Sequence, residues 1–326
     1  MKSILLDVDA GVDDTLAIIF ALLSPGLEVR GITTVAGNVP VRSCTRNVLL
    51  TLEILSPILH TIPPVSTGAS TPLQHTLFTA KEVHGNDGIG GASAFYPSTK
   101  RRATHANGVD LILELVKREA DLTLIATGPL TNIAIALKKD FPAMKRIREI
   151  VVMGGAFNGA HNTGPCAEFN FYVDPDAANA VMLSGLPIRL IPLNVTEQCI
   201  LTPDDLRAID DASLRRYIQR VTKFYFDFHQ RTENFVGGYL HDPLAVAAVL
   251  EPSLLKTELG YVHVERMSRY TRGMSIFFPR LNIRKQAELP KWVKSRLLRA
   301  PTVRVAISVD VKKFKQSFLR SLLQSQ

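Results

Sequence analysis

Short apolar runs alternate along the first part of the chain with longer segments in which apolar residues recur every three or four positions. Residues 3–9 form the first such run, which is rich in branched side chains and ends in a turn, as is typical of a buried strand. Residues 13–24 follow with a helical period and begin with acids, which the helix dipole favours in the first turn. The same patterns predict further strands over 27–37, 121–127, 147–155 and 187–195, and helices over 41–55, 108–120, 129–139 and 174–184.

This alternation predicts an α/β fold with an open, mostly parallel, doubly wound sheet of the Rossmann-like type and helices on both faces. After residue 200 the pattern changes, and the sequence predicts an added C-terminal region. That region comprises helices over 202–235, a helix from Asp242, strands over 260–280 and 302–310, and a closing helix after Asp310. No linker, internal repeat or low-complexity tract interrupts the sequence, so we expect a single domain over residues 1–326.

The composition, with 46% hydrophobic and 21% charged residues, is that of an ordinary globular protein. The longest uninterrupted apolar run, residues 16–23, is too short to span a bilayer, and Asp7 interrupts the N-terminal run too early for a signal peptide. Cys44, Cys166 and Cys199 form no C-x-x-C pair, which argues against a disulfide framework or a zinc knuckle. Sparse cysteines fit a reducing cytosol, so we expect a cytoplasmic protein.

The net charge of +8 is concentrated near the C-terminus. Residues 280–326 contain twelve Lys or Arg and two acids, a balance of +10, which leaves −2 for the rest of the chain. A basic tail can bind nucleic acid or an anionic membrane, but this one lacks the aromatic-studded motifs and zinc spacing of nucleic-acid-binding domains. We expect neither partner. We interpret the stretch as a solvated surface in which residues 280–301, with Trp292, form a basic insertion.

Candidate site residues follow the predicted strands where four of them end. The sequence DVDAGVDD, residues 7–14, closes the first strand, and Asn38, Thr127 and Met153 stand at the ends of three others. In open α/β sheets, ligands bind beyond the carboxyl ends of the strands. The sequence therefore predicts one binding site along this edge of the sheet.

Four acids crowd into residues 7–14, between apolar segments. Buried carboxylates cost several kcal/mol each unless they are paired or bound to a metal, and helix capping accounts only for Asp13 and Asp14. An aspartyl nucleophile for phosphoryl transfer would require a Thr or Val shortly after Asp9, where the sequence reads Ala-Gly, and a downstream Lys that we do not find. A divalent metal site that also holds a polyol explains all four acids best, because Ca²⁺ prefers carboxylate and carbonyl oxygens.

Residues 7–14 resemble the D-x-D-x-G-x-D-D signature of the nucleoside hydrolases, the inosine-uridine-preferring N-ribohydrolases. Other segments resemble further motifs of this family, in the family's order. These segments are TTVAGN (33–38), HGNDGIGG (84–91), ATGPLTNIA (126–134), VVMGGAF (151–157), NTGPCAEFNFYVDPDAA (162–178) and HDPLAV (241–246). One such motif would be weak evidence, but the ordered set is specific.

The resemblance implies an enzyme of purine or pyrimidine salvage that hydrolyses the N-glycosidic bond of ribonucleosides and assembles as a dimer or tetramer. It implies Ca²⁺ as the cofactor, held by Asp9, Asp14 and Asp242 and by the backbone carbonyl of Thr127. Asp9 would be the general base that deprotonates a metal-bound water. Asp7 would support the loop.

The resemblance also assigns the substrate contacts. Asp13, with the metal and helped by Asn38, would hold the ribose hydroxyls. Further substrate contacts would come from Met153, Asn162, Glu168 and Asn170, of which the last three would reach the rest of the sugar.

On the base side, His241 would protonate the leaving base or orient it, since imidazole suits proton transfer near neutral pH. His84 would contact the base from a Gly-rich loop. Tyr225 and His229 share one face of a predicted helix, either to contact the base or simply to pack. His229 stands where family members that accept both purines and pyrimidines carry a second tyrosine, so the sequence leaves the preferred base undecided.

The alternative functions are those of a metal-dependent phosphohydrolase and of a nucleoside- or ribose-binding protein that has lost catalysis.

Overall fold

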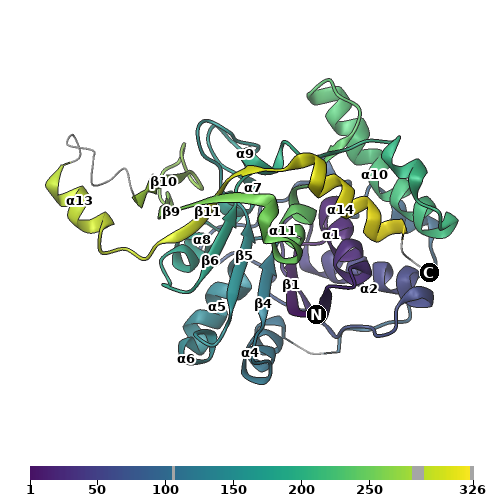
Figure 1. Ribbon diagram of the computed structural model, residues 1–326, viewed down its shortest axis with the longest axis horizontal. Coiled ribbons are helices and arrows are strands. Elements are labelled where there is room, and N and C mark those ends of the chain that lie inside the picture. The colour runs from purple at the N-terminus through teal and green to yellow at the C-terminus, as the bar shows by residue number, and fades with distance from the viewer. Residues whose placement is uncertain (105–106, 281–289, 324–326) are drawn as a thin grey trace.

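A nine-stranded sheet forms the centre of the molecule (Figure 1). The computed structural model describes residues 1–104, 107–280 and 290–323. The strands lie in the order β10-β9-β11-β6-β5-β4-β1-β2-β3. Their bounds are β1 Lys2–Val8, β2 Leu27–Thr34, β3 Val65–Thr67, β4 Thr123–Ala126, β5 Glu149–Met153, β6 Ile188–Ile191, β9 Leu255–Val264, β10 Ser275–Pro279 and β11 Val303–Val309.

Neighbouring strands from β3 across the sheet to β11 run parallel, whereas β9 is antiparallel to both of its neighbours, β11 and β10. This arrangement confirms the predicted open, mostly parallel sheet. The carboxyl ends of β1, β2, β4, β5 and β6 consequently lie along the same edge. The segments that follow these strands meet there, as the positions of the polar residues predict.

Helices cover both faces of the sheet (Figure 1). One layer consists of α1 (Val12–Leu23), α2 (Val41–Leu55), α11 (His241–Leu250) and α14 (Val311–Leu323), and the other of α4 (Gly108–Arg118), α5 (Thr131–Lys139), α6 (Phe141–Met144) and α8 (Pro175–Met182). The further helices are α3 Lys81–His84, α7 Phe169–Val173, α9 Leu193–Thr196, α10 Ala212–Thr232 and α13 Lys291–Leu297, with 3-10 turns at Ser56–Ile58, Ala92–Phe95, Asp205–Ala208 and Pro252–Leu254. Helix α8 begins as predicted, because the Asp174 carboxylate accepts a hydrogen bond from the Ala177 N–H at 3.0 Å.

Some segments differ from the sequence predictions. Residues 187–195, predicted as one strand, divide into β6 and α9, because Pro192 has no N–H to continue the ladder and precedes a helical turn. Residues 260–280 contain a loop between β9 and β10. Strand β3 and the separate pair β7 (Ile200–Leu201) and β8 (Gly238–Tyr239) are too short for a hydrophobic period to reveal them.

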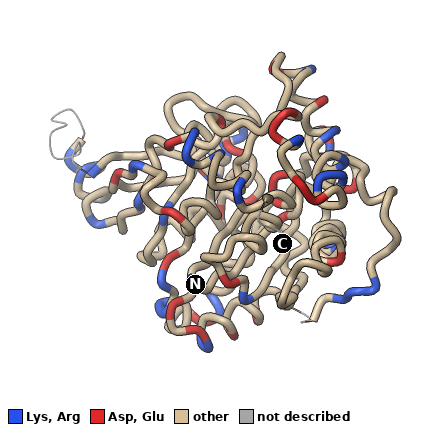
Figure 2. Tube along the Cα trace, turned by 45° about the vertical axis from the view of Figure 1, so that its right-hand side comes forward, with Lys and Arg blue, Asp and Glu red and all other residues tan. Residues whose placement is uncertain are grey.

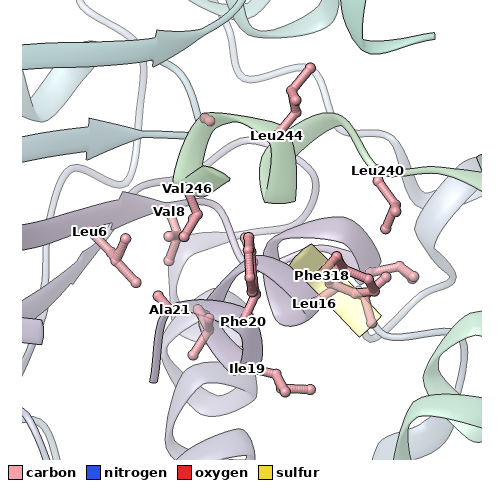
Figure 3. Close-up of a cluster of buried hydrophobic side chains, with 14 of the residues drawn as sticks. Leu6, Val8, Leu16, Ile19, Phe20, Ala21, Leu240, Leu244, Val246 and Phe318 are labelled. Atoms are coloured by element: carbon pink, nitrogen blue, oxygen red, sulfur yellow. The ribbon is translucent and has the colours of Figure 1, made fainter. Parts of the chain in front are cut away.

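The two ends of the chain share one hydrophobic core (Figure 3). Phe20 of α1 meets Phe318 of α14 edge to face, with ring centroids 5.3 Å apart, and both side chains are fully buried. Leu244 of α11 and Val8 of β1 belong to the same cluster. Since α11 packs against α1, apolar contacts set the position of the residues at the start of each helix.

The described residues of the basic C-terminal stretch do not form one continuous surface. Its described helices, α13 and α14, lie at well-separated places in the molecule (Figure 1), and Figure 2 shows Lys and Arg spread over many elements. Within the predicted insertion at 280–301, residues 281–289 lie outside the described residues, and Trp292 on α13 is largely exposed. Among the helices that the structure describes, none is long and apolar enough to cross a bilayer.

We predict that Phe318→Ala lowers the free energy of unfolding by about 3 to 5 kcal/mol, because it leaves a cavity between α14 and α1. Leu323→Ala, in the same helix but 39% exposed, is the matched control and should cost much less. Denaturant unfolding followed by circular dichroism measures both. A single domain over residues 1–326 should unfold in one cooperative transition. A separate early transition of the C-terminal region in the Phe318 variant would contradict the single domain.

Candidate active site

The acidic loop between β1 and α1 makes a tight turn that α2 holds in place. Ala10 has a positive φ of 31°, which L residues rarely adopt. Asn47 Nδ2 donates a hydrogen bond to the Ala10 carbonyl at 3.0 Å, and Cys44 Sγ donates one to the Asp9 carbonyl at 2.9 Å. These bonds offset the strain and fix the direction in which the acids of the loop project.

Four carboxyl groups gather at the end of β1. The carboxyl groups of Asp9 and Asp14 interact electrostatically, and so do those of Asp13 and Asp242, the latter supplied by α11. Carboxylate oxygens of Asp13, Asp14 and Asp242 lie within 4.8 Å of one another. All four side chains are buried. The fold thus joins an acid from far along the chain to the three from the loop.

Burial and mutual repulsion make these acids hard to ionise. Burial, followed by the negative charge of Asp14, raises the pKa of Asp13 to about 7 and the pKa of Asp9 well above its usual range. Burial and the neighbouring carboxylates raise the pKa of Asp242 in the same way. Burial raises the pKa of Asp14 too, although the Thr127 hydroxyl opposes this shift by donating a hydrogen bond at 2.7 Å. A cation among these groups would take the place of the protons that they otherwise retain.

The available oxygens suit a hard divalent cation. Asp9 Oδ1 and Asp13 Oδ1 are buried without a hydrogen-bond partner among the described residues. Thr127, which follows β4, adds a backbone carbonyl that Asn170 Nδ2 orients through a hydrogen bond of 2.8 Å. Carboxylate and carbonyl oxygens are the ligands that Ca²⁺ and Mg²⁺ prefer. The donor set therefore fits such an ion.

Asp7 lies outside the cavity and ties the loop to its neighbours. Its Oδ1 accepts hydrogen bonds from Thr33 Oγ1 at 2.6 Å and Asn132 Nδ2 at 2.8 Å. Asn132 Nδ2 also donates to the Thr34 carbonyl at 3.0 Å, so that β1, β2 and α5 are joined. Burial raises the pKa of Asp7 to about 6. This geometry fits the supporting role that the resemblance implies.

A cavity of about 450 Å³ opens above the acids. Of the predicted site residues, only Asp9 and Asp14 do not line it, and both are fully buried and hydrogen-bonded to residues close to it. The predicted residues that line the cavity are Asp13, Asn38, His84, Thr127, Met153, Asn162, Glu168, Asn170, Tyr225, His229, His241 and Asp242. The structure thus gathers at one place residues that the sequence spreads over most of its length.

One side of the cavity is built on Glu168 and Asn170. Glu168 caps α7 and accepts hydrogen bonds from the backbone N–H groups of Gly155 at 2.8 Å and Asn170 at 2.7 Å. Burial raises the pKa of Glu168 to about 7, and these bonds oppose the shift. Asn170 Nδ2 also reaches the Met153 carbonyl, at 3.3 Å. Asn162 lies on the exposed rim, where its Oδ1 accepts a backbone N–H at 2.9 Å.

Another side is formed by His84 and, from α10, by Tyr225 and His229, which share a helix face as their spacing predicts. His84 stacks on Tyr225 with ring centroids 5.7 Å apart, and its Nδ1 accepts the Val12 N–H at 3.1 Å. His229 Nδ1 donates to the Tyr225 carbonyl at 2.8 Å, and its Nε2 lies 3.8 Å from a Glu233 oxygen. Burial lowers the pKa of His84 to about 3 and lowers the pKa of His229 as well, so both rings are neutral at pH 7.

His241, the first residue of α11, also lines the cavity, directly before Asp242. Its Nδ1 lies 2.7 Å from the hydroxyl oxygen of Thr196. Burial, with repulsion from His229 and His84, lowers the pKa of His241 to about 3. The ring therefore meets the cavity as a neutral imidazole.

Sequence reasoning missed several residues in and behind the outer part of the cavity. Glu197, Glu233 and Tyr239 line it, and the Tyr239 hydroxyl donates to Glu233 at 2.5 Å. Thr196 and Glu197 follow the carboxyl end of β6, and Glu233 stands one helical turn after His229, so strand ends and helical spacing could have found them. In the part of the chain that the structure describes, no Lys or Arg lines the cavity.

Comparisons with known proteins point to one family. A family model described as inosine-uridine preferring nucleoside hydrolase matches residues 4–316. Uridine nucleosidase 1 of Arabidopsis thaliana is 37% identical, over 81% of this chain and 78% of its own. Two solved structures each cover 99% of both chains: a plant nucleoside hydrolase, with a TM-score of 0.89 and 32% identity, and a purine-preferring ribonucleoside hydrolase from Gardnerella vaginalis, with a TM-score of 0.86 and 33% identity.

The family match begins in β1 and ends in α14, so it includes the acidic loop, the residues around the cavity and the segment that carries Asp242. The structural matches extend the similarity to the whole architecture. The chain therefore belongs to the inosine-uridine preferring nucleoside hydrolase family and is a hydrolase that acts on N-glycosyl bonds.

Proposed function

We propose that the protein uses Ca²⁺ to hydrolyse ribonucleosides to ribose and free base. One observation carries this proposal: the buried carboxyl groups of Asp9, Asp13, Asp14 and Asp242 meet beneath a cavity of about 450 Å³. That volume is typical of a small-molecule site. A cluster of this charge is costly unless it serves a cation and a substrate that develops positive charge.

Asp9, Asp14 and Asp242 would hold Ca²⁺, together with the carbonyl of Thr127. When bound, the ion neutralises the clustered charge and makes a coordinated water easier to deprotonate. Ca²⁺ suits this set better than Mg²⁺, because it accepts more oxygens in a less regular geometry.

Asp9 is the residue best suited to take a proton from the attacking water. Its Oδ2 accepts the Asn38 N–H at 2.7 Å, which fixes the carboxyl group, while its Oδ1 has no partner among the described residues. Gly37 permits this approach, since a Cβ there would lie 2.0 Å from Asp9 Oδ2. One anchored oxygen and one available oxygen are what a general base needs.

The sugar side would favour the transition state over the substrate. Breaking an N-glycosidic bond leaves an oxocarbenium-like ribosyl group, whose positive charge nearby carboxylates stabilise. Asp13 and Asn38 would hold the ribose hydroxyls. The other proposed contacts to the substrate are Met153, Asn162, Glu168 and Asn170. Binding energy that these contacts deliver only as the sugar flattens would raise the rate.

The base side would hold the leaving group between His84 and Tyr225, with His229 nearby and His241 assisting departure. Proteins named as uridine and as purine-preferring hydrolases are similar to this chain to a comparable degree. The preferred base therefore depends on the few side chains of this wall. His229 is the one that departs from the family's tyrosine, so we propose it as a determinant of base preference.

The two alternatives find less support. A phosphohydrolase would need a cationic side chain for the transferring group, whereas none of the described Lys or Arg residues lines the cavity. A binding protein would need neither an available carboxylate oxygen on Asp9 nor the imidazole of His241 on the cavity wall. We propose further that the protein works in the cytosol, where its three free thiols would stay reduced, and as a dimer or tetramer, which light scattering would measure.

Ribonucleosides should release free base, whereas phosphate esters and nucleotides should release no phosphate. We expect kcat/KM for 2′-deoxyribonucleosides to be lower by at least about 100-fold, because buried polar groups lose their partner. Chromatography measures the released base, and a phosphate assay measures the released phosphate. Asn38→Ala should reduce the ratio of kcat/KM for ribonucleosides to kcat/KM for 2′-deoxyribonucleosides. Phosphate release without base release would contradict the proposed function. Equal kcat/KM for both sugars would remove Asp13 and Asn38 from sugar recognition.

Asp14→Asn should lose bound Ca²⁺ and lower kcat by roughly 100-fold or more, because a ligand is removed while the volume is kept. Asp174→Asn is the matched control: Asp174 is equally buried, but backbone and hydroxyl donors satisfy it within α8 and α5. That control should lose stability and keep its calcium. Elemental analysis and turnover measure the difference, and an Asp14 variant with full calcium and normal turnover would exclude the proposed site.

His241→Ala should impair uridine and inosine far more than nitrophenyl riboside, whose leaving group needs no proton. His229→Tyr should change the ratio of kcat/KM for uridine and inosine with little effect on the activated substrate, because it restores the tyrosine of the family. Steady-state kinetics on the three substrates test both. If a variant lost the same factor in kcat/KM on all three substrates, its histidine would instead serve in packing or in binding the sugar.

A further inference from the structure

Thr196 contacts the Nδ1 ring nitrogen of His241 from outside the cavity. Thr196 is fully buried and does not line the cavity, whereas His241 does. Its Oγ1 lies 2.7 Å from His241 Nδ1 and 3.1 Å from the carbonyl of Leu193, one turn earlier in α9. A single hydroxyl thus links the histidine to the helix backbone.

The number of hydrogen bonds decides which nitrogen carries the proton. A carbonyl only accepts, so the bond to Leu193 uses the single proton of the Thr196 hydroxyl. The hydroxyl oxygen then accepts a hydrogen bond from the Nδ1–H group of His241. If the hydroxyl donated to Nδ1 instead, the bond to Leu193 would be lost and one hydrogen bond fewer would form. Buried polar groups favour the arrangement with more bonds.

This arrangement serves the neutral and the protonated ring equally. In the neutral ring with its proton on Nδ1, and in the imidazolium, the same Nδ1–H donates to Thr196. The hydroxyl therefore does not need to rotate when Nε2 gains or loses a proton. His84 has the opposite form, since its Nδ1 accepts the Val12 N–H and its own proton must lie on Nε2. The local hydrogen-bond partners therefore determine which nitrogen of each histidine ring is protonated.

The backbone holds the two residues at this separation. The Leu193 N–H donates to the Gly155 carbonyl at 2.9 Å, which fixes the start of α9 beside β5. The N–H of the residue before His241 donates to the Cys199 carbonyl at 2.8 Å. Thr196 lies between these two anchors. Backbone hydrogen bonds therefore anchor the two segments that bring Thr196 and His241 together.

We propose that Thr196 is a positioning residue that keeps a proton on Nδ1 of His241. Nε2 of the neutral ring then carries the lone pair, so a proton from solvent water binds at Nε2, passes from there to the leaving base and leaves the ring neutral again. This inference rests on the proposed role of His241 in departure of the base. It adds a residue that touches neither substrate nor metal, and it states which atom of His241 faces the leaving group.

Thr196→Val tests the proposal, because valine keeps the shape and removes the hydroxyl. We expect kcat on uridine and inosine to fall by about 10- to 100-fold, as for other residues that orient a catalytic group, with KM nearly unchanged. Turnover of nitrophenyl riboside should change by less than about threefold, since its leaving group needs no proton. Thr196→Ser keeps the hydroxyl and should restore most of kcat on the nucleosides.

Thr51→Val is the matched control. Thr51 is equally buried, donates to its own helix at the Asn47 carbonyl at 2.8 Å and lies 2.8 Å from the Tyr217 hydroxyl, outside the cavity. The Thr51→Val variant should therefore be less stable, but its kcat on nucleosides should not fall selectively. An equal loss on all substrates in Thr196→Val, or no rescue by serine, would overturn the positioning role.

Nitrogen-15 NMR of histidine-labelled protein locates the proton directly, with the His241 signal assigned from His241→Gln. We expect the neutral wild-type ring to be protonated on Nδ1 and Thr196→Val to shift the population toward Nε2. A wild-type ring protonated on Nε2 would refute the inference. This measurement is independent of turnover: a protein that released no base would refute the proposed function, and the NMR signal would still decide the position of the proton.

Discussion

Repulsion among four buried carboxylates is the interaction on which the rest of the structure near the cavity depends. The loop tolerates an alanine at positive φ because Asn47 and Cys44 hold its carbonyls. Its fourth acid arrives on α11, whose place is set by apolar packing against α1. A bound cation and a positively charged sugar relieve the same repulsion. A single unfavourable arrangement, maintained by the hydrophobic core, would therefore both bind the metal and favour the transition state.

The two sides of the cavity are held by different means. Around Glu168 and Asn170, backbone N–H and carbonyl groups provide most of the partners, so the main chain itself fixes the side chains. On the opposite side, His84, His229 and His241 each have one ring nitrogen held by a partner outside the substrate space. The first kind of support follows from the fold. On the second side the partner is a backbone group for His84 and His229 and the Thr196 hydroxyl for His241, and it holds one nitrogen of each ring. We propose that substitutions of these histidines would change base preference while the sugar chemistry persists.

The charge of the cavity also limits what it accepts. Glu197 and Glu233 add negative charge at the outer part, where burial and Glu233 raise the pKa of Glu197, and no described Lys or Arg lines the walls. A phosphorylated sugar would meet carboxylates without a compensating cation from the protein. A neutral nucleoside meets no such penalty, and its ribosyl group gains from the same field as it becomes positive.

The sequence by itself determined the longer strands, most helices and the residues of the acidic loop, because apolar period, capping and turn chemistry are local. The helix predicted over 41–55 has those bounds in the structure, and the helix predicted over 174–184 begins at its capping residue, Asp174. Only the tertiary structure decided that α9 interrupts the segment after β6 and that Thr196 reaches His241. Those contacts join residues far apart in the chain, or a short turn with no period of its own, and they arise from sheet order and helix packing that no local pattern encodes.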